Sequence, residues 1–227
     1  MRAVCLQHVP FEGPGAFAEA LSKRGIALER WLVPSVGLPA EPADMLIVMG
    51  GPVSVNDPEA WITEEIAYIR SALSRGTAII GVCLGSQFMA KALGATVRPG
   101  TKPEIGMMPV SLTPEARQDR FLQDLPESVD VFEWHGEIFD PPHRAVTLAR
   151  SSAAPVQAFR YGERAYGLLF HLEIDAAGIE ALCRECPQDL ADAGLTAQQL
   201  KDRALPHLPR LHRLAERLAG QLVDSCH

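Results

Sequence analysis

Cys83 is the side chain in this sequence with the clearest capacity for covalent chemistry. It lies in Gly81-Val82-Cys83-Leu84-Gly85, with one glycine two positions before it and another two positions after it. Small residues at this spacing suit a tight turn from a strand into a helix, which holds a nucleophile in a strained conformation and clear of the sheet. The N-terminus of the following helix favours a thiolate and offers N–H groups to an oxyanion. We therefore predict a cysteine nucleophile, although a buried structural cysteine is the plainer alternative.

A cysteine nucleophile needs a base, and His171 and Glu173 are the best candidates for it. They follow the apolar segment 165–170, and residues two apart in an extended segment project to the same side. In this interpretation His171 takes the proton of Cys83, while Glu173 fixes the imidazole tautomer and stabilises its charged form. A surface His-x-Glu pair is the alternative, and its position at the end of an apolar strand favours the catalytic interpretation.

The sequence Gly50-Gly51-Pro52 directly follows the apolar run 45–49. Glycines let the backbone approach a ligand closely, and their N–H groups can point into a site. Ligands of open α/β sheets bind beyond the carboxyl ends of the strands, so this segment and Cys83 are expected to share a crevice. We predict an oxyanion hole formed by the N–H groups of Gly51 and Leu84, with a plain β-turn as the alternative.

The first half of the chain alternates short apolar runs with helical periodicity, which predicts an α/β fold with an open, mostly parallel sheet flanked by helices. Asp57 is expected to cap the second of these helices and Pro58 to occupy its first turn. The segment 34–42 is expected to be a connector. The predicted strands are 2–7, 26–33, 45–49 and 77–82, and the predicted helices are 16–24, 58–75 and 85–93.

The second half of the chain contains further strand-like runs with few helices between them, which predicts a smaller antiparallel or mixed extension of the sheet. From residue 175 onward the pattern is helical, and a leucine-rich stripe over 208–222 is expected to cover the domain. We expect a single domain over 1–227, with a core at about 1–175 and a helical tail at about 176–227. The further predicted strands are 95–97, 106–112, 129–134, 145–149, 156–159 and 165–170.

The composition is that of an ordinary globular protein, with 47% hydrophobic and 22% charged residues. A formal net charge of −7 without a Lys/Arg cluster argues against nucleic-acid binding. The apolar runs are too short to span a bilayer, and the N-terminus resembles no signal peptide. Five scattered cysteines indicate no disulfide framework, so a reducing cytoplasmic setting is expected. Cys183 and Cys186 form a C-x-x-C without a second ligand pair; no metal or cofactor is predicted, and a thiol redox role for this pair remains an alternative.

Taken together, the motifs resemble those of class I glutamine amidotransferase domains, the Cys-His-Glu type found in the glutaminase part of GMP synthase. The resemblance covers about residues 1–175, and the segments HVPFEGPG and GGPVSVNDP are similar to those of the free-standing, GMP synthase-like members. It implies a three-layer, flavodoxin-like sheet with a smaller antiparallel extension. The matching motifs are GGP (50–52), GVCLGSQ (81–87), EIG (104–106), WHGE (134–137) and AYGLLFHLE (165–173).

The resemblance implies hydrolysis of the γ-carboxamide of L-glutamine through a γ-glutamyl thioester on Cys83, with release of ammonia and without a cofactor. It further implies that Gln87 and the backbone around His135 and Gly136 hold the amino-acid end of the substrate. Gly50 is also predicted to be a substrate-binding residue, because a glycine there lets the backbone approach a ligand closely.

Three features depart from the GMP synthase pattern. Leu84 stands where an aromatic residue is frequent, Glu137 stands where Asp is common, and the sequence contains no synthetase domain. An ammonia acceptor would therefore have to be a separate synthetase or ligase subunit. A γ-glutamyl peptide hydrolase or transferase using the same triad, and a catalytically silent regulatory subunit, remain alternatives, and the oligomeric state is not predicted.

Overall fold

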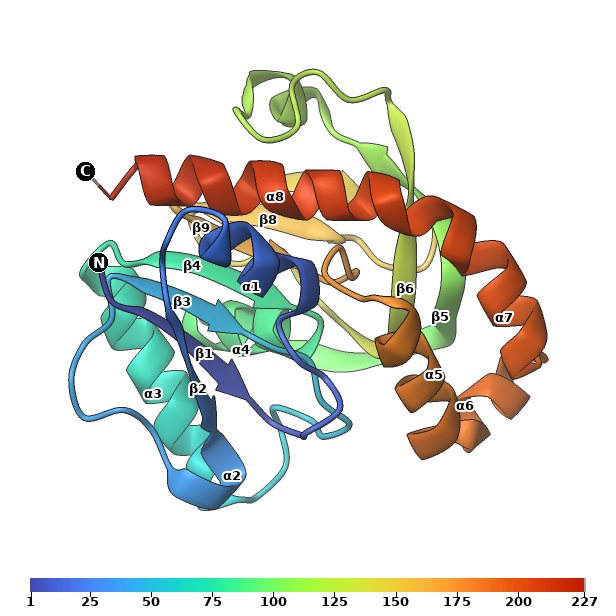
Figure 1. The fold of residues 1–227 in the computed structure, drawn as a ribbon, viewed down its shortest axis with the longest axis horizontal. Coiled ribbons are helices and arrows are strands. Elements are labelled where there is room, and N and C mark those ends of the chain that lie inside the picture. The colour runs from blue at the N-terminus through green and yellow to red at the C-terminus, as the bar shows by residue number, and fades with distance from the viewer. Residues whose placement is uncertain (227) are drawn as a thin grey trace.

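A single mixed sheet organises the computed structural model, which describes residues 1–226. Within this part of the chain the sheet has nine strands in the order β2-β1-β3-β4-β9-β8-β7-β5-β6. The strands from β2 to β9 in this order are mutually parallel, and the remaining pairs are antiparallel (Figure 1). The strands are β1 (Ala3–Gln7), β2 (Leu28–Leu32), β3 (Met45–Val48), β4 (Ala78–Val82), β5 (Val97–Leu112), β6 (Ser128–Phe139), β7 (Ala145–Arg150), β8 (Ala158–Tyr161) and β9 (Ala165–Leu168).

Helices cover both faces of the parallel part of the sheet. The helices are α1 (Gly15–Ser22), α2 (Val33–Val36), α3 (Ala60–Ser74), α4 (Leu84–Ala92), α5 (Ala176–Glu185), α6 (Pro187–Asp192), α7 (Ala197–Ala204) and α8 (Leu208–Asp224), with short 3₁₀ turns at Pro114–Gln118 and Leu205–His207. Helices α1 and α8 lie on one face, and α3 and α4 lie on the other (Figure 1). The predicted three-layer α/β architecture with an antiparallel extension is confirmed.

The pleat of the central strand explains its uninterrupted apolar sequence. Met45 and Ile47 of β3 are buried in the same cluster as α1 and α8, whereas Leu46 and Val48 are buried against α3 and α4. A strand covered on both faces needs an apolar side chain at every position, whereas a strand with one face exposed to solvent needs one only at every second position.

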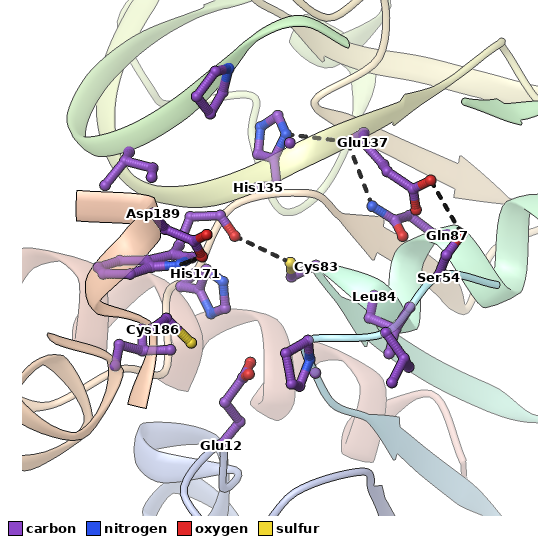
Figure 2. A pocket seen from close by; sticks show the side chains of 18 of the residues that line it. Glu12, Ser54, Cys83, Leu84, Gln87, His135, Glu137, His171, Cys186 and Asp189 are labelled. Atoms are coloured by element: carbon purple, nitrogen blue, oxygen red, sulfur yellow. Dashed lines mark hydrogen bonds between the residues drawn. The ribbon is translucent and has the colours of Figure 1, made fainter. Parts of the chain in front are cut away.

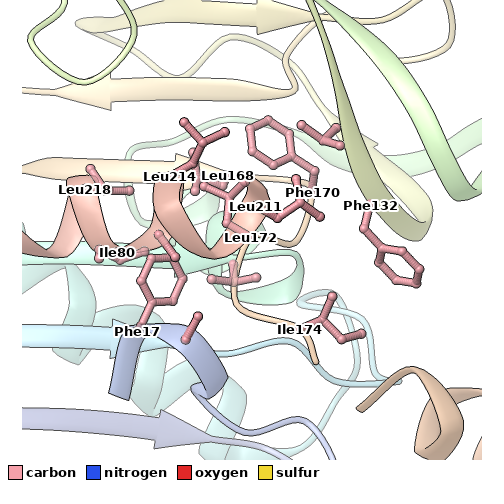
Figure 3. Close-up of a cluster of buried hydrophobic side chains, with 14 of the residues drawn as sticks. Phe17, Ile80, Phe132, Leu168, Phe170, Leu172, Ile174, Leu211, Leu214 and Leu218 are labelled. Atoms are coloured by element: carbon pink, nitrogen blue, oxygen red, sulfur yellow. The ribbon is translucent and has the colours of Figure 1, made fainter. Parts of the chain in front are cut away.

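The C-terminal helix completes the core on one side of the sheet. Leu211, Leu214 and Leu218 of α8 lie against the region of Phe17 in α1 and Ile80 in β4 (Figure 3). Each fully buried leucine contributes about 1.5–3 kcal/mol relative to an exposed one. The leucine stripe is therefore used for packing, as its spacing predicts.

Several predicted boundaries are wrong. Helix α3 begins at Ala60 and not at Pro58, and the Asp57 carboxylate accepts a hydrogen bond from the Ser54 N–H at 2.8 Å instead of capping the helix. The expected connector 34–42 includes part of the short helix α2, and the two runs 95–97 and 106–112 are parts of one strand, β5. Residues 99–104 belong to β5 because β6 pairs with it on both sides of an irregularity there. No helix within residues 1–226 is both long and apolar enough to cross a membrane.

Candidate active site

Cys83 occupies the turn between β4 and α4 in a strained backbone conformation. Its φ is 49° and its ψ is −111°, values that residues other than glycine rarely adopt. The Cys83 N–H donates to the Leu168 carbonyl at 2.8 Å, which ties the turn to β9. A side chain at Gly85 would overlap the Val48 carbonyl, and one at Gly81 would come within 2.7 Å of the Gly85 carbonyl oxygen. The tight strand-to-helix turn predicted from the glycine spacing is present.

His171 and Glu173 lie just beyond the end of β9, the strand next to β4 in the sheet. The His171 N–H donates to the Phe132 carbonyl at 2.8 Å, and this bridge to β6 fixes the backbone. In the side chains, Nδ1 of His171 lies 2.7 Å from Oε1 of Glu173, and both groups are buried. Because a carboxylate accepts this hydrogen bond, Nδ1 carries the proton and Nε2 is turned to other partners.

Nε2 of His171 has no hydrogen-bond partner among residues 1–226, although it is fully buried. Burial disfavours the imidazolium, but the charges of Glu173 and Cys83 and the hydrogen bond between Nδ1 and Glu173 together outweigh burial and raise the pKa of His171 well above its ordinary value. The Cys83 sulfur lies 3.5 Å from the Trp134 carbonyl oxygen, to which its thiol donates. His171 is therefore poised to hold a proton beside this sulfur.

Cys83 and His171 line one cavity of about 330 Å³, a size suited to a small molecule. Gly51, Leu84, Gln87, His135 and Gly136 line the same cavity, as the sequence predicts (Figure 2). Gly50 is not among the lining residues, and its carbonyl oxygen instead lies 3.0 Å from Nδ1 of His8.

One end of the cavity presents fixed polar groups. Gln87 Nε2 donates to the Glu137 carbonyl at 3.4 Å, and the Ser54 hydroxyl donates to the Glu137 carboxylate at 3.1 Å (Figure 2). The sequence assigns no role to Glu137 or Ser54, although both lie in the motifs named above. These groups can bind the ammonium and carboxylate of an amino acid.

The ring of His135 is fully engaged by the protein. Nδ1 lies 3.1 Å from the Glu137 carbonyl oxygen, while Nε2 lies 3.1 Å from Glu133 and 3.4 Å from Glu104. Burial opposes protonation, yet hydrogen bonds to the two carboxylates raise the pKa of His135 to about 10. This leaves the backbone of His135 and Gly136, and not the ring, to meet a ligand.

The opposite side of the cavity contains residues that the sequence did not place in the site. Glu12 points into the cavity beside His171, and burial raises the pKa of its carboxyl. Cys186 and Asp189 line the cavity from the α5–α6 corner, and Asp189 accepts a hydrogen bond from the Trp134 indole at 3.0 Å. Cys183 and Cys186 are free thiols. No local pattern marks Glu12, because only the folded loop brings it to His171.

Comparison with known proteins identifies the family to which the chain belongs. A sequence model of the glutamine amidotransferase class-I family matches residues 16–178. The chain belongs to this family. Among its relatives is the putative glutamine amidotransferase-like protein YfeJ of Salmonella typhimurium, 32% identical over 206 residues that cover 85% of this chain and 84% of the relative. One subunit of the glutamine-hydrolysing GMP synthase of Sulfurisphaera tokodaii is 35% identical over 133 residues, which cover 58% of this chain and 68% of that protein.

Solved structures agree with this class I assignment. A glutamine amidotransferase from Thermotoga maritima matches with a TM-score of 0.89 and 26% identity, covering 99% of this chain and 98% of the other. A glutamine amidotransferase from Methylobacillus flagellatus matches with a TM-score of 0.88 and 28% identity, over 98% and 94% of the two chains. The resemblance seen in the sequence motifs is thus confirmed over nearly the whole chain.

Within residues 1–226, no group of three or more His, Cys, Asp or Glu side chains is arranged to hold a metal ion.

Proposed function

We propose that this class I glutamine amidotransferase hydrolyses the γ-carboxamide of L-glutamine with Cys83 as the nucleophile, His171 as the base and Glu173 as the orienting carboxylate. The observation that carries the proposal is the strained turn that presents Cys83 to the cavity lined by His171, whose Nδ1 is occupied by Glu173 and whose Nε2 is free among residues 1–226. A plain buried cysteine would need neither the positive φ nor a charged neighbour.

In this mechanism the Cys83 thiol passes its proton to Nε2 of His171 as the sulfur attacks the carboxamide carbon. The carbonyl oxygen becomes an oxyanion, which the N–H groups of Gly51 and Leu84 receive. The carbon–nitrogen bond then breaks, and the His171 proton goes to the leaving nitrogen, which departs as ammonia. Water attacks the thioester with His171 as base, the carbon–sulfur bond breaks, and glutamate leaves with Cys83 restored.

Positioning of the substrate follows from the same cavity. Gln87 and the backbone of His135 and Gly136 would hold the amino-acid end, and the Glu137 carboxylate is close enough to this end to bind an ammonium. With that end fixed, the carbonyl carbon of the γ-carboxamide would lie toward Cys83 at the N-terminus of α4. The N-terminus of a helix also favours the negative charge of a thiolate or an oxyanion.

A second substrate class is favoured by the extent of the cavity. Beyond Cys83 the cavity continues to Leu182, Cys186 and Asp189 at the α5–α6 corner. This space lies on the side opposite Gln87 and is larger than the amide nitrogen of glutamine requires. A γ-glutamyl peptide or amine would fit there, and the same triad would hydrolyse it or transfer its γ-glutamyl group.

If glutamine is the substrate, we propose that the ammonia passes to a separate synthetase subunit. The support is the description of the relative from Sulfurisphaera tokodaii, which is one subunit of a GMP synthase and not the whole enzyme.

Glutamate release from glutamine and from γ-glutamyl dipeptides tests the proposal. Cys83→Ser should lower kcat/KM by about 10³-fold or more, as loss of a catalytic nucleophile does. Cys183→Ser is the matched control, because it changes a free cysteine that does not line the cavity and should retain activity. Equal activity of Cys83→Ser and the wild type would refute the mechanism, and selective labelling of Cys83 by an electrophilic glutamine analogue would exclude a silent regulatory site.

A further inference from the structure

A buried ion pair lies directly behind the Gly50–Gly51 segment and takes no part in the chemistry proposed above. His8 follows β1, and Glu65 lies on α3. Nε2 of His8 lies 3.0 Å from the Glu65 carboxylate, and the two side chains are 1% and 0% exposed. A buried charged pair contributes little net stability compared with apolar residues of the same volume. Its presence here therefore calls for a role other than stability.

The hydrogen bonds of His8 fix where its protons lie. Nδ1 lies 3.0 Å from the Gly50 carbonyl oxygen, which can only accept, so Nδ1 must carry a hydrogen. Nε2 faces a carboxylate at the same time. Burial opposes a charged ring, but the charge and hydrogen bond of Glu65, the Gly50 carbonyl and the charge of Glu12 together outweigh burial and raise the pKa of His8. His8 is thus a double donor.

The ring of His8 is also clamped between aromatic side chains. Its centroid lies 5.7 Å from that of Trp61 and 5.3 Å from that of Phe88, with interplanar angles of 26° and 24°. Aromatic faces attract a cation, so this stacking suits an imidazolium. The stacking and the two hydrogen bonds leave His8 with a single orientation.

The peptide bond between Gly50 and Gly51 transmits this orientation to the cavity. A trans peptide is planar, and its C=O and N–H groups point in opposite directions. Because His8 holds the Gly50 carbonyl, the Gly51 N–H is directed away from His8. Gly51 lines the cavity together with Cys83 and Leu84.

Without such a hold, a peptide between two glycines would rotate easily, because glycine tolerates a wide range of φ and ψ values. The packing permits no bulkier residue at this place, since a Cβ on Gly51 would lie 2.9 Å from Cβ of His8 and 3.1 Å from Cδ2 of Leu84. The orientation of this peptide must therefore come from a neighbour.

We propose that His8 and Glu65 are positioning residues that hold the Gly50–Gly51 peptide with its N–H turned toward Cys83, and so preset one donor of the oxyanion hole. The inference rests on the proposed function, because an oxyanion forms only if Cys83 attacks a carbonyl. Glu65 acts through His8, because it keeps the ring protonated and oriented so that Nδ1 donates to the Gly50 carbonyl.

The test compares two substitutions of His8. His8→Phe keeps a ring between Trp61 and Phe88 but removes the donor to Gly50, whereas His8→Asn places an amide N–H near the position of Nδ1. We expect kcat for glutamine to fall about 10- to 100-fold in His8→Phe, with KM within about threefold of wild type, because an oxyanion donor acts mainly in the transition state. His8→Asn should recover much of this loss.

Alkylation of Cys83 by iodoacetamide separates positioning from general damage. This displacement occurs at a saturated carbon and forms no oxyanion, so its rate depends on Cys83 and His171 but not on the Gly51 N–H. The rate in His8→Phe should stay within about twofold of wild type, because the substitution leaves the thiol and its base in place. Wild-type kcat in His8→Phe, or a parallel loss of kcat and alkylation rate, would overturn the proposal.

Crystal structures of the two variants decide the question even if the wild type hydrolyses no γ-glutamyl compound, an outcome that would refute only the proposed function. The Gly50–Gly51 peptide should be rotated in His8→Phe and retained in His8→Asn. An unrotated peptide in His8→Phe would overturn the positioning role whatever the activity.

Discussion

The backbone strain at Cys83 should be measurable as stability, and a pair of substitutions isolates it. A residue held at a positive φ in a sparsely populated region costs about 1–3 kcal/mol. Glycine avoids this cost because it has no Cβ, but it loses about 0.4–1 kcal/mol relative to alanine through the greater freedom of the unfolded chain. With φ at 49° and ψ at −111°, we expect Cys83→Gly to be about 1 kcal/mol more stable than Cys83→Ala.

Both variants lack the thiol, so their difference does not contain the loss of sulfur contacts. Cys83 is also the N-cap residue of α4, a position where glycine is favoured over alanine for another reason. Thr196 provides the control, because it is the N-cap of α7 with an ordinary backbone, φ −95° and ψ 155°. The entropy of the unfolded chain and the N-cap preference apply at both sites, so the gap in unfolding free energy between glycine and alanine should be larger at Cys83 than at Thr196 by the strain alone, about 1–3 kcal/mol.

Urea denaturation and thermal unfolding of the four variants measure these gaps, and 1 kcal/mol corresponds to about 2–4 °C in Tm for a chain of this size. Cys83→Gly and Cys83→Ala should both be inactive. Equal gaps at Cys83 and Thr196, or a more stable alanine variant at Cys83, would show that the turn stores no strain and would remove one argument for a functional cysteine.

Three further perturbations test other contacts of the site. Gly85→Ala should reduce kcat/KM about 100-fold and lower Tm, because the new methyl group overlaps the Val48 carbonyl and displaces the N-terminus of α4; an unchanged Tm would contradict this. Glu173→Gln should lower the pKa of His171, measured by NMR titration of the ring, and reduce kcat/KM by about 10³- to 10⁴-fold; an unshifted pKa would disprove the coupling. The pKa of His135 rises from 6.5 to about 10 on folding, so its contribution to stability is fully present below about pH 6.5 and is lost as the pH rises through about 10. Urea unfolding across the range from about pH 6 to about pH 10 should show this loss, and a His135→Gln variant with the same pH slope as wild type would refute the assignment.

Local patterns in the sequence were sufficient for the parts of the fold that depend on short-range geometry. The glycines at 81 and 85 predict the turn at Cys83 because each of them has a backbone atom where a Cβ would lie. The apolar run at β3 predicts a central strand because both of its faces are covered. These features are encoded within a few residues of where they act.

Features that depend on distant partners were missed. The length of β5 is set by its pairing with β6, so the sequence between 97 and 106, which contains Pro99, Gly100 and Pro103, does not by itself predict a strand. The start of α3 was misplaced because Asp57 bonds to the Ser54 N–H of the preceding loop.

The same limit applies within the site. His8 and Glu65 are 57 positions apart, and no pattern in the sequence around either residue predicts their contact. The sequence does predict that Cys83, His171 and Glu173 lie near one another, because each of them lies in a recognisable motif at the end of a strand. Their catalytic roles remain predictions.

The pairing of β4 with β9 has a consequence for how the chain is made. Val82 and Leu168 are partners in this ladder, and the Cys83 N–H itself bonds to Leu168. During translation Cys83 leaves the ribosome long before His171, and the turn lacks its hydrogen bond to Leu168 until β9 has been synthesised and inserted between β4 and β8. In a nascent or truncated chain the turn at Cys83 is therefore not yet anchored, and Cys83 and His171 come to line one cavity only on completion of the sheet.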